Sequence, residues 1–262
     1  DILTMFALMR KMKGSPSSWA ERRVHRAYRR EWRKHFGGTE FSLVIHYNGY
    51  EAYVISLLEE APCPKIIWVH SDMVHEIEER GNQNLYILRE AYNVYDRVVT
   101  VSGDVVDPVI HGIGGDPSRV KVIPSCHDHK KVLTLAERPL SFEPVTESTH
   151  NLEEIREILD NKDVKFISIG RFSPEKGHKR LLDAFEQYRK EYPATWMIII
   201  GGSGSMYEET AEYAAKLSSA DHIVLIRSLR NPMPVLKKCS LFILSSYYEG
   251  QGLVMLEADT LG

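Results

Sequence analysis

Short apolar runs alternate with amphipathic stretches along almost the whole chain. Eight runs rich in β-branched residues have the length of strands that are buried on both faces. They are residues 41–47, 65–70, 97–102, 121–124, 164–169, 196–200, 222–227 and 241–245. Apolar residues recur at helical spacing in 85–95, 181–190 and 207–217. This alternation predicts an α/β fold in which helices cover both faces of parallel sheets.

The alternation is interrupted once, at residues 137–150, which contain prolines and show no clear period. We interpret this segment as a linker or surface loop between two Rossmann-like domains, residues 1–140 and 141–262. Ligands of open α/β sheets bind outside the carboxyl ends of the strands. We therefore expect two domains that face a cleft, with the chemistry in the loops that follow the strands.

Composition narrows the class of protein. Hydrophobic residues make up 43% of the 262 residues and charged residues 26%, which is typical of a soluble globular protein. Three cysteines lie far apart, which excludes a disulfide scaffold and favours a cytoplasmic location. The net charge of −3 argues against a nucleic-acid binder. The chain starts without Met and stops just after a helical pattern, so we expect a protein truncated at both ends.

Positive charge is concentrated near the N-terminus, where residues 10–34 contain ten Lys or Arg and two acidic residues. Residues 19–36 form a predicted helix whose apolar stripe comprises Ala20, Val24, Tyr28, Trp32 and Phe36. A basic amphipathic helix suits an anionic membrane surface, so peripheral contact with the inner face of a membrane is one expectation. In the alternative, the stripe packs on the first domain and the arginines are solvated or hold an anionic acceptor.

Two glycine-containing loops follow predicted strands of the second domain. Gly170 is followed by Arg171 and, five residues later, Lys176, and two such cations at a helix start can hold a diphosphate. A solvated turn is the alternative. Gly202 and Gly204 lie in the next loop, which matches neither the dinucleotide fingerprint nor a P-loop. This argues against a nicotinamide dehydrogenase and a P-loop ATPase.

The last predicted strand is followed by two glutamates that seven residues separate, Glu249 and Glu257. Gly250, Gly252 and Leu253 lie between them and offer backbone amides to a phosphate at the start of a helix. Each carboxylate can accept two hydrogen bonds from a pair of sugar or ribose hydroxyls. A carboxylate favoured by the helix dipole would explain Glu249, but it does not explain the pair.

Taken together and in this order, these motifs and Asn231-Pro232 resemble the donor site of the retaining glycosyltransferases of family 4, which have the GT-B fold. The resemblance covers roughly residues 41–262. In the first domain, residues 99–102 and 122–124 resemble strand ends of the family. Ser125-Cys126-His127-Asp128 follows where the family often has Asn-Gly, which is a departure.

The resemblance implies transfer of a sugar from a nucleotide-diphosphate sugar to a hydroxyl acceptor with retention of configuration. Residues 1–140 would then be the acceptor-side domain and residues 141–262 the nucleotide-sugar-binding domain. Arg171 and Lys176 would neutralise the leaving diphosphate, Glu257 would bind the ribose, and Glu249 would contact the donor sugar. The acceptor would be a glycan, a polyol or a lipid-linked compound in polysaccharide or glycolipid synthesis.

His70 ends the strand at 65–70, at a position where the family often has a histidine near the reaction centre. We therefore add His70 to Arg171, Lys176 and Glu249 as a candidate catalytic residue, with a structural strand-end histidine as the alternative. Asp72 and His75 follow closely, and a metal site of these three residues is a weaker interpretation. We expect no metal site and no cofactor, since no Asp-x-Asp metal motif is apparent and the donor is a substrate.

Two other functions use the same features. A nucleotide-sugar epimerase or hydrolase of this fold would use the same donor site but need no acceptor groove. A non-catalytic fragment that binds nucleotide would need neither an acceptor nor the catalytic residues.

Overall fold

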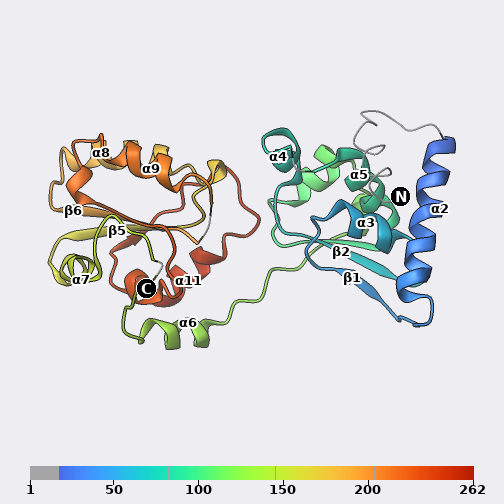
Figure 1. The fold of residues 1–262 in the computed structure, drawn as a ribbon, viewed down its shortest axis with the longest axis horizontal. Helices are drawn as coiled ribbons and strands as arrows, with labels where there is room; N and C mark the ends of the chain where they lie inside the picture. The colour runs from blue at the N-terminus through green and yellow to red at the C-terminus, as the bar shows by residue number, and fades with distance from the viewer. Residues whose placement is uncertain (1–17, 82, 145, 203) are drawn as a thin grey trace. The chain divides into compact units, whose positions relative to one another are not determined.

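The computed structural model describes residues 18–262 apart from residues 82, 145 and 203, with side chains from Arg23 onward (Figure 1). Two compact units are present. The first contains the residues up to Ser125 together with Glu249–Gln251, and the second contains Cys126–Tyr248 and Gly252–Gly262. The chain thus enters the second unit at Cys126, whereas we had placed the boundary between residues 140 and 141.

The first unit is built on a sheet of four parallel strands in the order β1-β2-β3-β4. Their bounds are β1 Val44–His46, β2 Lys65–Val69, β3 Arg97–Thr100 and β4 Val120–Val122. Its helices are α2 Ser18–Phe36, α3 Ala52–Glu59, α4 Met73–Glu78 and α5 Leu85–Val94, with short turns at Pro108–Ile113 and Pro117–Arg119. Each strand lies within about two residues of a predicted one or inside it, and the predicted helices at 19–36 and 85–95 are confirmed.

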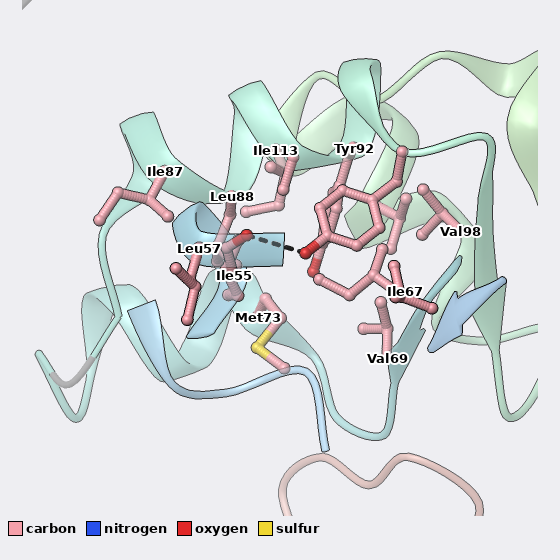
Figure 2. Packing of buried hydrophobic residues seen from close by; sticks show 14 of the residues in the cluster. Ile55, Leu57, Ile67, Val69, Met73, Ile87, Leu88, Tyr92, Val98 and Ile113 are labelled. Atoms are coloured by element: carbon pink, nitrogen blue, oxygen red, sulfur yellow. Dashed lines mark hydrogen bonds between the residues drawn. The ribbon is translucent and has the colours of Figure 1, made fainter. Parts of the chain in front are cut away.

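Aliphatic side chains from strands and helices form one core in this unit (Figure 2). Ile67 and Val69 of β2 pack against Ile55 of α3 and Leu88 of α5, and all four are buried. The buried Tyr95 donates its hydroxyl proton to the carbonyl oxygen of Ile55 across 2.8 Å. This bond satisfies a polar group that would otherwise be costly in an apolar interior.

Helix α2 packs against this core through four residues of the stripe that we had considered for membrane contact; the side chain of the fifth, Ala20, lies outside the described residues. Tyr28 and Trp32 are buried, and Val24 and Phe36 pack partly buried beside them. The rings of Trp32 and Phe36 lie 4.6 Å apart between centroids. The apolar face is therefore occupied within the unit, and membrane contact stays a prediction that would depend on the exposed arginines of α2. Among the described residues, no helix combines the length and apolar character that a membrane crossing requires.

The second unit has a sheet of four parallel strands in the order β7-β6-β5-β8. Their bounds are β5 Val164–Ile169, β6 Thr195–Ile200, β7 Ile223–Ile226 and β8 Leu241–Phe242. The helices are α6 His129–Ala136, α7 Leu152–Asp160, α8 His178–Arg189, α9 Tyr207–Ala214, α10 Met233–Lys237 and α11 Leu253–Leu261, with short 3₁₀ turns at Pro174–Lys176 and Ala220–His222. The predicted strands at 164–169, 196–200 and 222–227 and the predicted helix at 181–190 are confirmed. Of the predicted strand at 241–245 only Leu241–Phe242 forms, and the predicted helix at 207–217 ends at Ala214.

Alternate residues of the central strands face opposite layers. In β6, Ile198 and Ile200 belong to a core that helices α6, α7 and α10 complete. Met197 and Ile199 belong to a second core, which helices α8 and α9 complete. A strand buried on both faces requires an uninterrupted apolar run, which explains why the strands were visible as continuous runs in the sequence.

Residues 137–150 lie within the second unit and do not run between the two units. Ser148 forms an antiparallel bridge with Ile226 of β7. The amide of Arg227 donates to the carbonyl oxygen of Glu147 at 2.8 Å, and the amide of Leu225 donates to the hydroxyl of Thr149 at 2.9 Å. The segment lacks a period of its own because its hydrogen bonds are made to a distant strand.

The packing of α2 leads to a prediction about stability. We expect Trp32→Ala to lower the free energy of unfolding of the first unit by about 3–5 kcal/mol, because it leaves a cavity in the core. The neighbouring exposed change Arg33→Ala should alter it by about 0.5 kcal/mol or less. Denaturant unfolding measures both variants, and equal midpoints for Trp32→Ala and the unchanged protein would contradict this packing.

Candidate functional site

Three of the loops predicted to carry chemistry start at the carboxyl edge of the second sheet. Parallel pairing places the ends of β5 and β6 at one level, with Ile169 beside Ile200. The amide of Gly170 then donates to the carbonyl oxygen of Ile200 at 2.9 Å. The carboxyl ends of all strands in a parallel sheet lie on the same edge, so these loops start close together.

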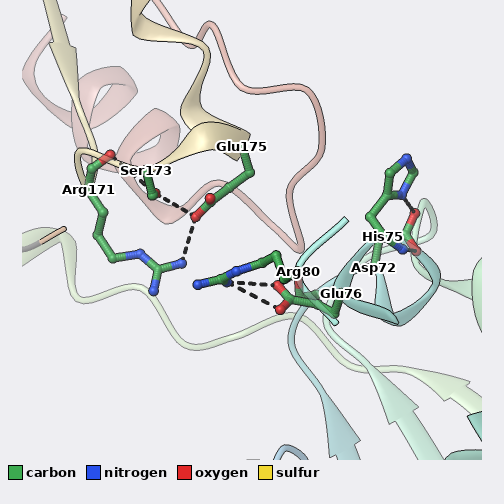
Figure 3. Close-up of polar contacts among 8 residues, drawn as sticks. Asp72, His75, Glu76, Arg80, Arg171, Ser173 and Glu175 are labelled. Atoms are coloured by element: carbon green, nitrogen blue, oxygen red, sulfur yellow. Dashed lines mark hydrogen bonds and ion pairs between the residues drawn. The ribbon is translucent and has the colours of Figure 1, made fainter. Parts of the chain in front are cut away.

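Arg171 is held by a buried carboxylate in its own loop (Figure 3). Its Nη2 atom donates to Oε1 of Glu175 at 3.0 Å, and the hydroxyl of Ser173 donates to the same oxygen at 2.7 Å. The side chain of Glu175 is only 5% exposed, whereas that of Arg171 is 52% exposed. Glu175 therefore fixes one side of a guanidinium whose remainder faces solvent.

Lys176 packs its aliphatic stem over Gly170. A Cβ atom at Gly170 would lie 3.3 Å from Cδ of Lys176, so a larger residue would press on the lysine. The hydroxyl of Ser245 donates to the carbonyl oxygen of Lys176 at 2.7 Å, and the amide of Tyr247 donates to that of Glu175 at 2.8 Å. The loop after β5 is thereby tied to the loop after β8.

Gly202 and Gly204, two of the glycines in the loop after β6, have different surroundings. Gly204 has a φ of +122°, and a Cβ atom there would lie 2.2 Å from the carbonyl oxygen of Phe172. Gly202 is exposed, with nothing within 4 Å of the Cβ position. Gly204 is thus needed for the fold of the loop, while Gly202 leaves its backbone open to a ligand.

His178, at the first position of α8, is buried next to the loop after β5, and its ring lies 5.0 Å from that of Phe172 in this loop. Burial, and secondly the charge of Lys176, lower its pKa to about 4. The imidazole is therefore neutral at pH 7, and in this loop the positive charge comes from Arg171 and Lys176.

Glu257 lies about one turn inside α11, which Gly252 caps and Leu253 begins. It is partly buried, and burial raises the pKa of its carboxyl group, an effect that the charge of His127 opposes. The Nε2 atom of His127 contacts the hydroxyl of Thr260 at 2.8 Å. The residues that depart from the family's Asn-Gly pattern thus place a histidine beside the helix of Glu257.

His70 in the first unit lies at the end of β2, where its Nε2 atom donates to the carbonyl oxygen of Tyr47 at 2.7 Å. Asp72 caps α4, and its Oδ2 atom contacts Nδ1 of His75 at 2.7 Å (Figure 3). Asp72 and His75 therefore pair with each other. In the described part of the chain these residues do not form a group with metal-ligand spacing.

Glu249–Gln251 are grouped with the first unit. There the carbonyl oxygen of Gly250 accepts a hydrogen bond from the hydroxyl of Ser102 at 2.5 Å. A Cβ atom at Gly250 would lie 1.8 Å from the carbonyl oxygen of His70, so this close approach requires glycine. The structure thus brings His70 and Gly250 together in one unit, and brings Gly170, Arg171 and Lys176 together in the other.

Sequence reasoning missed two residues, one in the loop after β5 and one at the start of α8. Glu175 stands four residues after Arg171, and a carboxylate between two cations in one turn was a signal that could have identified it. His178 offered no such signal, because its low pKa results from burial within the folded unit.

Comparison with known proteins identifies the family. Residues 10–131 match the family described as Glycosyltransferase Family 4, and residues 151–262 match Glycosyl transferases group 1. The chain belongs to the group 1 glycosyltransferases of the family 4 type. The predicted resemblance is therefore confirmed.

Individual relatives of this chain are distant. It is 25% identical over 198 residues to an uncharacterized glycosyltransferase of Methanocaldococcus jannaschii, which covers 75% of this chain and 46% of the relative. It is 27% identical over 150 residues to the Escherichia coli UDP-Gal:alpha-D-GlcNAc-diphosphoundecaprenol alpha-1,3-galactosyltransferase, covering 56% of this chain and 36% of that protein. The chain thus spans less than half the length of either relative.

The fold also matches solved structures. A crystal structure of Anabaena HepE with UDP and glucose aligns with a TM-score of 0.63 at 17% identity, over 94% of this chain and 62% of that one. An α,α-trehalose-phosphate synthase from Burkholderia vietnamiensis aligns with a TM-score of 0.65 at 14% identity, over 95% and 61%. The chain therefore has the predicted GT-B architecture of two parallel-sheet units.

The contrast between the two glycines gives a matched test of the loop after β6. We expect Gly204→Ala to destabilise the second unit by about 1–3 kcal/mol, because its backbone conformation is unfavourable for any side chain. Gly202→Ala should leave the free energy of unfolding almost unchanged, because its Cβ position is open. Denaturant unfolding of both variants tests this. Equal losses of stability would show that the described loop geometry is wrong.

Proposed function

We propose that this glycosyltransferase moves a sugar from a nucleotide-diphosphate sugar to a hydroxyl acceptor with retention of anomeric configuration. The observation that carries the proposal is the pair of cations, Arg171 and Lys176, at the carboxyl edge of the second sheet. They lie in a loop that a buried carboxylate holds in place. The structure of HepE with UDP and glucose and the UDP-Gal donor in the name of the E. coli relative support a donor of this class.

In the proposed reaction, the bond between the anomeric carbon and the diphosphate oxygen breaks, and negative charge develops on the leaving diphosphate. Arg171 and Lys176 supply fixed positive charge where that oxygen would lie, and such preorganised charges stabilise a transition state strongly. The open backbone at Gly202 offers an amide to the same group. In this proposal the protein's own cations balance the diphosphate, so neither a metal ion nor a cofactor takes part.

In this proposal the two carboxylates bind different parts of the donor. We assign Glu257 to the ribose, because a carboxylate accepts hydrogen bonds from two neighbouring hydroxyls and this one is partly buried. Glu249 is assigned to the donor sugar. His70 is assigned to the reaction centre, where its Nε2 proton is committed to the carbonyl oxygen of Tyr47 and its Nδ1 atom can accept a hydrogen bond when the ring is neutral.

The acceptor in this proposal is a hydroxyl compound used in the synthesis of a polysaccharide or a glycolipid. The name of the E. coli relative includes a diphosphoundecaprenol acceptor, which supports a lipid-linked compound. A lipid-linked acceptor would bring the enzyme to a membrane surface, where the exposed arginines of α2 could contact anionic lipid.

The cation pair can be tested with variants that preserve packing. Arg171→Gln removes the charge but keeps a polar side chain, and Lys176→Met keeps an apolar stem over Gly170. We expect each to lower turnover about 100-fold or more, with little change in the unfolding midpoint. Lys190→Met, an exposed change after α8, is the matched control and should retain full activity. Near-normal turnover in both site variants would rule out the proposed role.

Variants of the two carboxylates should differ in their affinity for the nucleotide. We expect Glu257→Gln to weaken the affinity for the free nucleoside diphosphate about 10-fold or more, because it loses a charge-assisted hydrogen bond to the ribose. Glu249→Gln should bind the same nucleotide normally and transfer sugar poorly. Calorimetric titration with UDP beside a transfer assay distinguishes the two, and equal effects on UDP affinity would contradict the division of roles.

A further inference from the structure

A second group of titratable side chains lies in the first unit, apart from the residues assigned to the donor. His25 comes from α2, Glu59 is the last residue of α3, Glu60 caps that helix, and Glu90 comes from α5. We propose that His25, Glu59 and Glu90 bind a divalent transition-metal ion such as Zn²⁺, and that Glu60 orients the histidine. The site would clamp α2 onto α3 and α5.

The spacing of the three side chains suits one ion. One ligand atom from each of His25, Glu59 and Glu90 lies within 4.8 Å of the other two. Ligand atoms bonded to zinc at about 2.0–2.2 Å lie no more than about 4.4 Å apart. Small side-chain movements would therefore close the three atoms around an ion.

The burial of Glu59 is the observation that points to a cation ligand. The residue is only 8% exposed, and both of its carboxylate oxygens are buried without a hydrogen-bond partner. A buried carboxylate without a partner is costly. It also stands beside Glu60 at the carboxyl end of α3, where the helix dipole favours positive charge and disfavours negative charge.

The surroundings of His25 already have the form of a metal-bound histidine. Its Nδ1 atom lies 2.7 Å from Oε1 of Glu60, and its Nε2 atom lies 2.8 Å from Oε1 of Glu90. Arg29 holds the other oxygen of Glu60 at 3.0 Å. When an ion binds at Nε2, the Nε2 proton leaves to solvent and Nδ1–H stays bonded to Glu60. A carboxylate that accepts from the outer nitrogen is the usual partner of a metal-ligating histidine.

The donor set selects the kind of ion. One imidazole nitrogen and two carboxylate oxygens, completed by water, are donors that Zn²⁺ and other first-row transition ions accept. Mg²⁺ instead prefers oxygen ligands and keeps most of its waters. The proposal adds a structural ion to a protein for which the sequence had suggested no metal site, and it leaves the proposed transfer chemistry unchanged.

The test uses the whole chain, freed of metal with a chelator and then dialysed. We expect one Zn²⁺ to bind per chain and to raise the unfolding temperature by about 5–10 °C at a concentration 100 times its Kd. Mg²⁺ at the same concentration should have little effect. If zinc does not change the unfolding temperature, the proposal is overturned, and the group is a network of ion pairs and hydrogen bonds.

Variants locate the ion. Glu59→Gln and Glu90→Gln should each weaken Zn²⁺ binding more than about 100-fold, and Glu60→Gln, which removes the outer partner, should weaken it about 10–100-fold. Glu79→Gln makes the same chemical change at an exposed position of this unit and should bind Zn²⁺ normally. Zinc affinities of Glu59→Gln and Glu90→Gln equal to that of Glu79→Gln would show adventitious binding and overturn the proposal.

Stability without metal separates a ligand from a structural residue. Burial raises the pKa of the Glu59 carboxyl group well above its usual range, and Glu59→Gln replaces that group with a neutral amide without breaking a described hydrogen bond. We therefore expect this variant to be at least as stable as the unchanged protein when no zinc is present. When zinc is added, the unchanged protein should become more stable than the variant. A large loss of stability in zinc-free buffer would show that Glu59 has a structural partner, which would overturn its assignment as a ligand.

Discussion

Parallel hydrogen bonding between β5 and β6 is the constraint on which the second unit depends. Residues Phe166 to Ile169 pair in register with Met197 to Ile200, so both strands end at the same level. The loops that follow them must then start side by side, and both faces of the sheet must be covered by helices. The cations and the open glycine backbone share one edge because of this pairing, although about 30 residues separate them in the chain.

Much of the fold could be predicted from the sequence because the strands are buried on both faces. Such strands need continuous apolar runs, and the run at Trp196–Ile200 is as clear in the sequence as in the sheet. The cations and glycines of the donor loops were also visible, since their spacing is local. What could not be predicted depends on contacts between residues far apart in the chain.

The missed features show this limit in physical terms. Glu60 and Glu90 reach His25 from two other helices, and neither distance in sequence suggests a contact. The burial that lowers the pKa of His178 exists only after the second unit has folded. The basic helix was ambiguous for a similar reason. Its aromatic stripe fits a membrane surface and a protein core equally well, and only the packing of Tyr28 and Trp32 shows that it serves the core.

The bridge between Ser148 and Ile226 has a consequence for association between molecules. A sheet edge with unpaired amides and carbonyl groups can pair with a strand of another chain and so start aggregation. Residues 147–149 occupy these groups along β7, at one edge of the sheet. The opposite edge is β8, which has only two residues, Leu241 and Phe242, and is too short to accept a foreign strand firmly. Each edge of this sheet is thus protected in a different way against growth into a larger sheet.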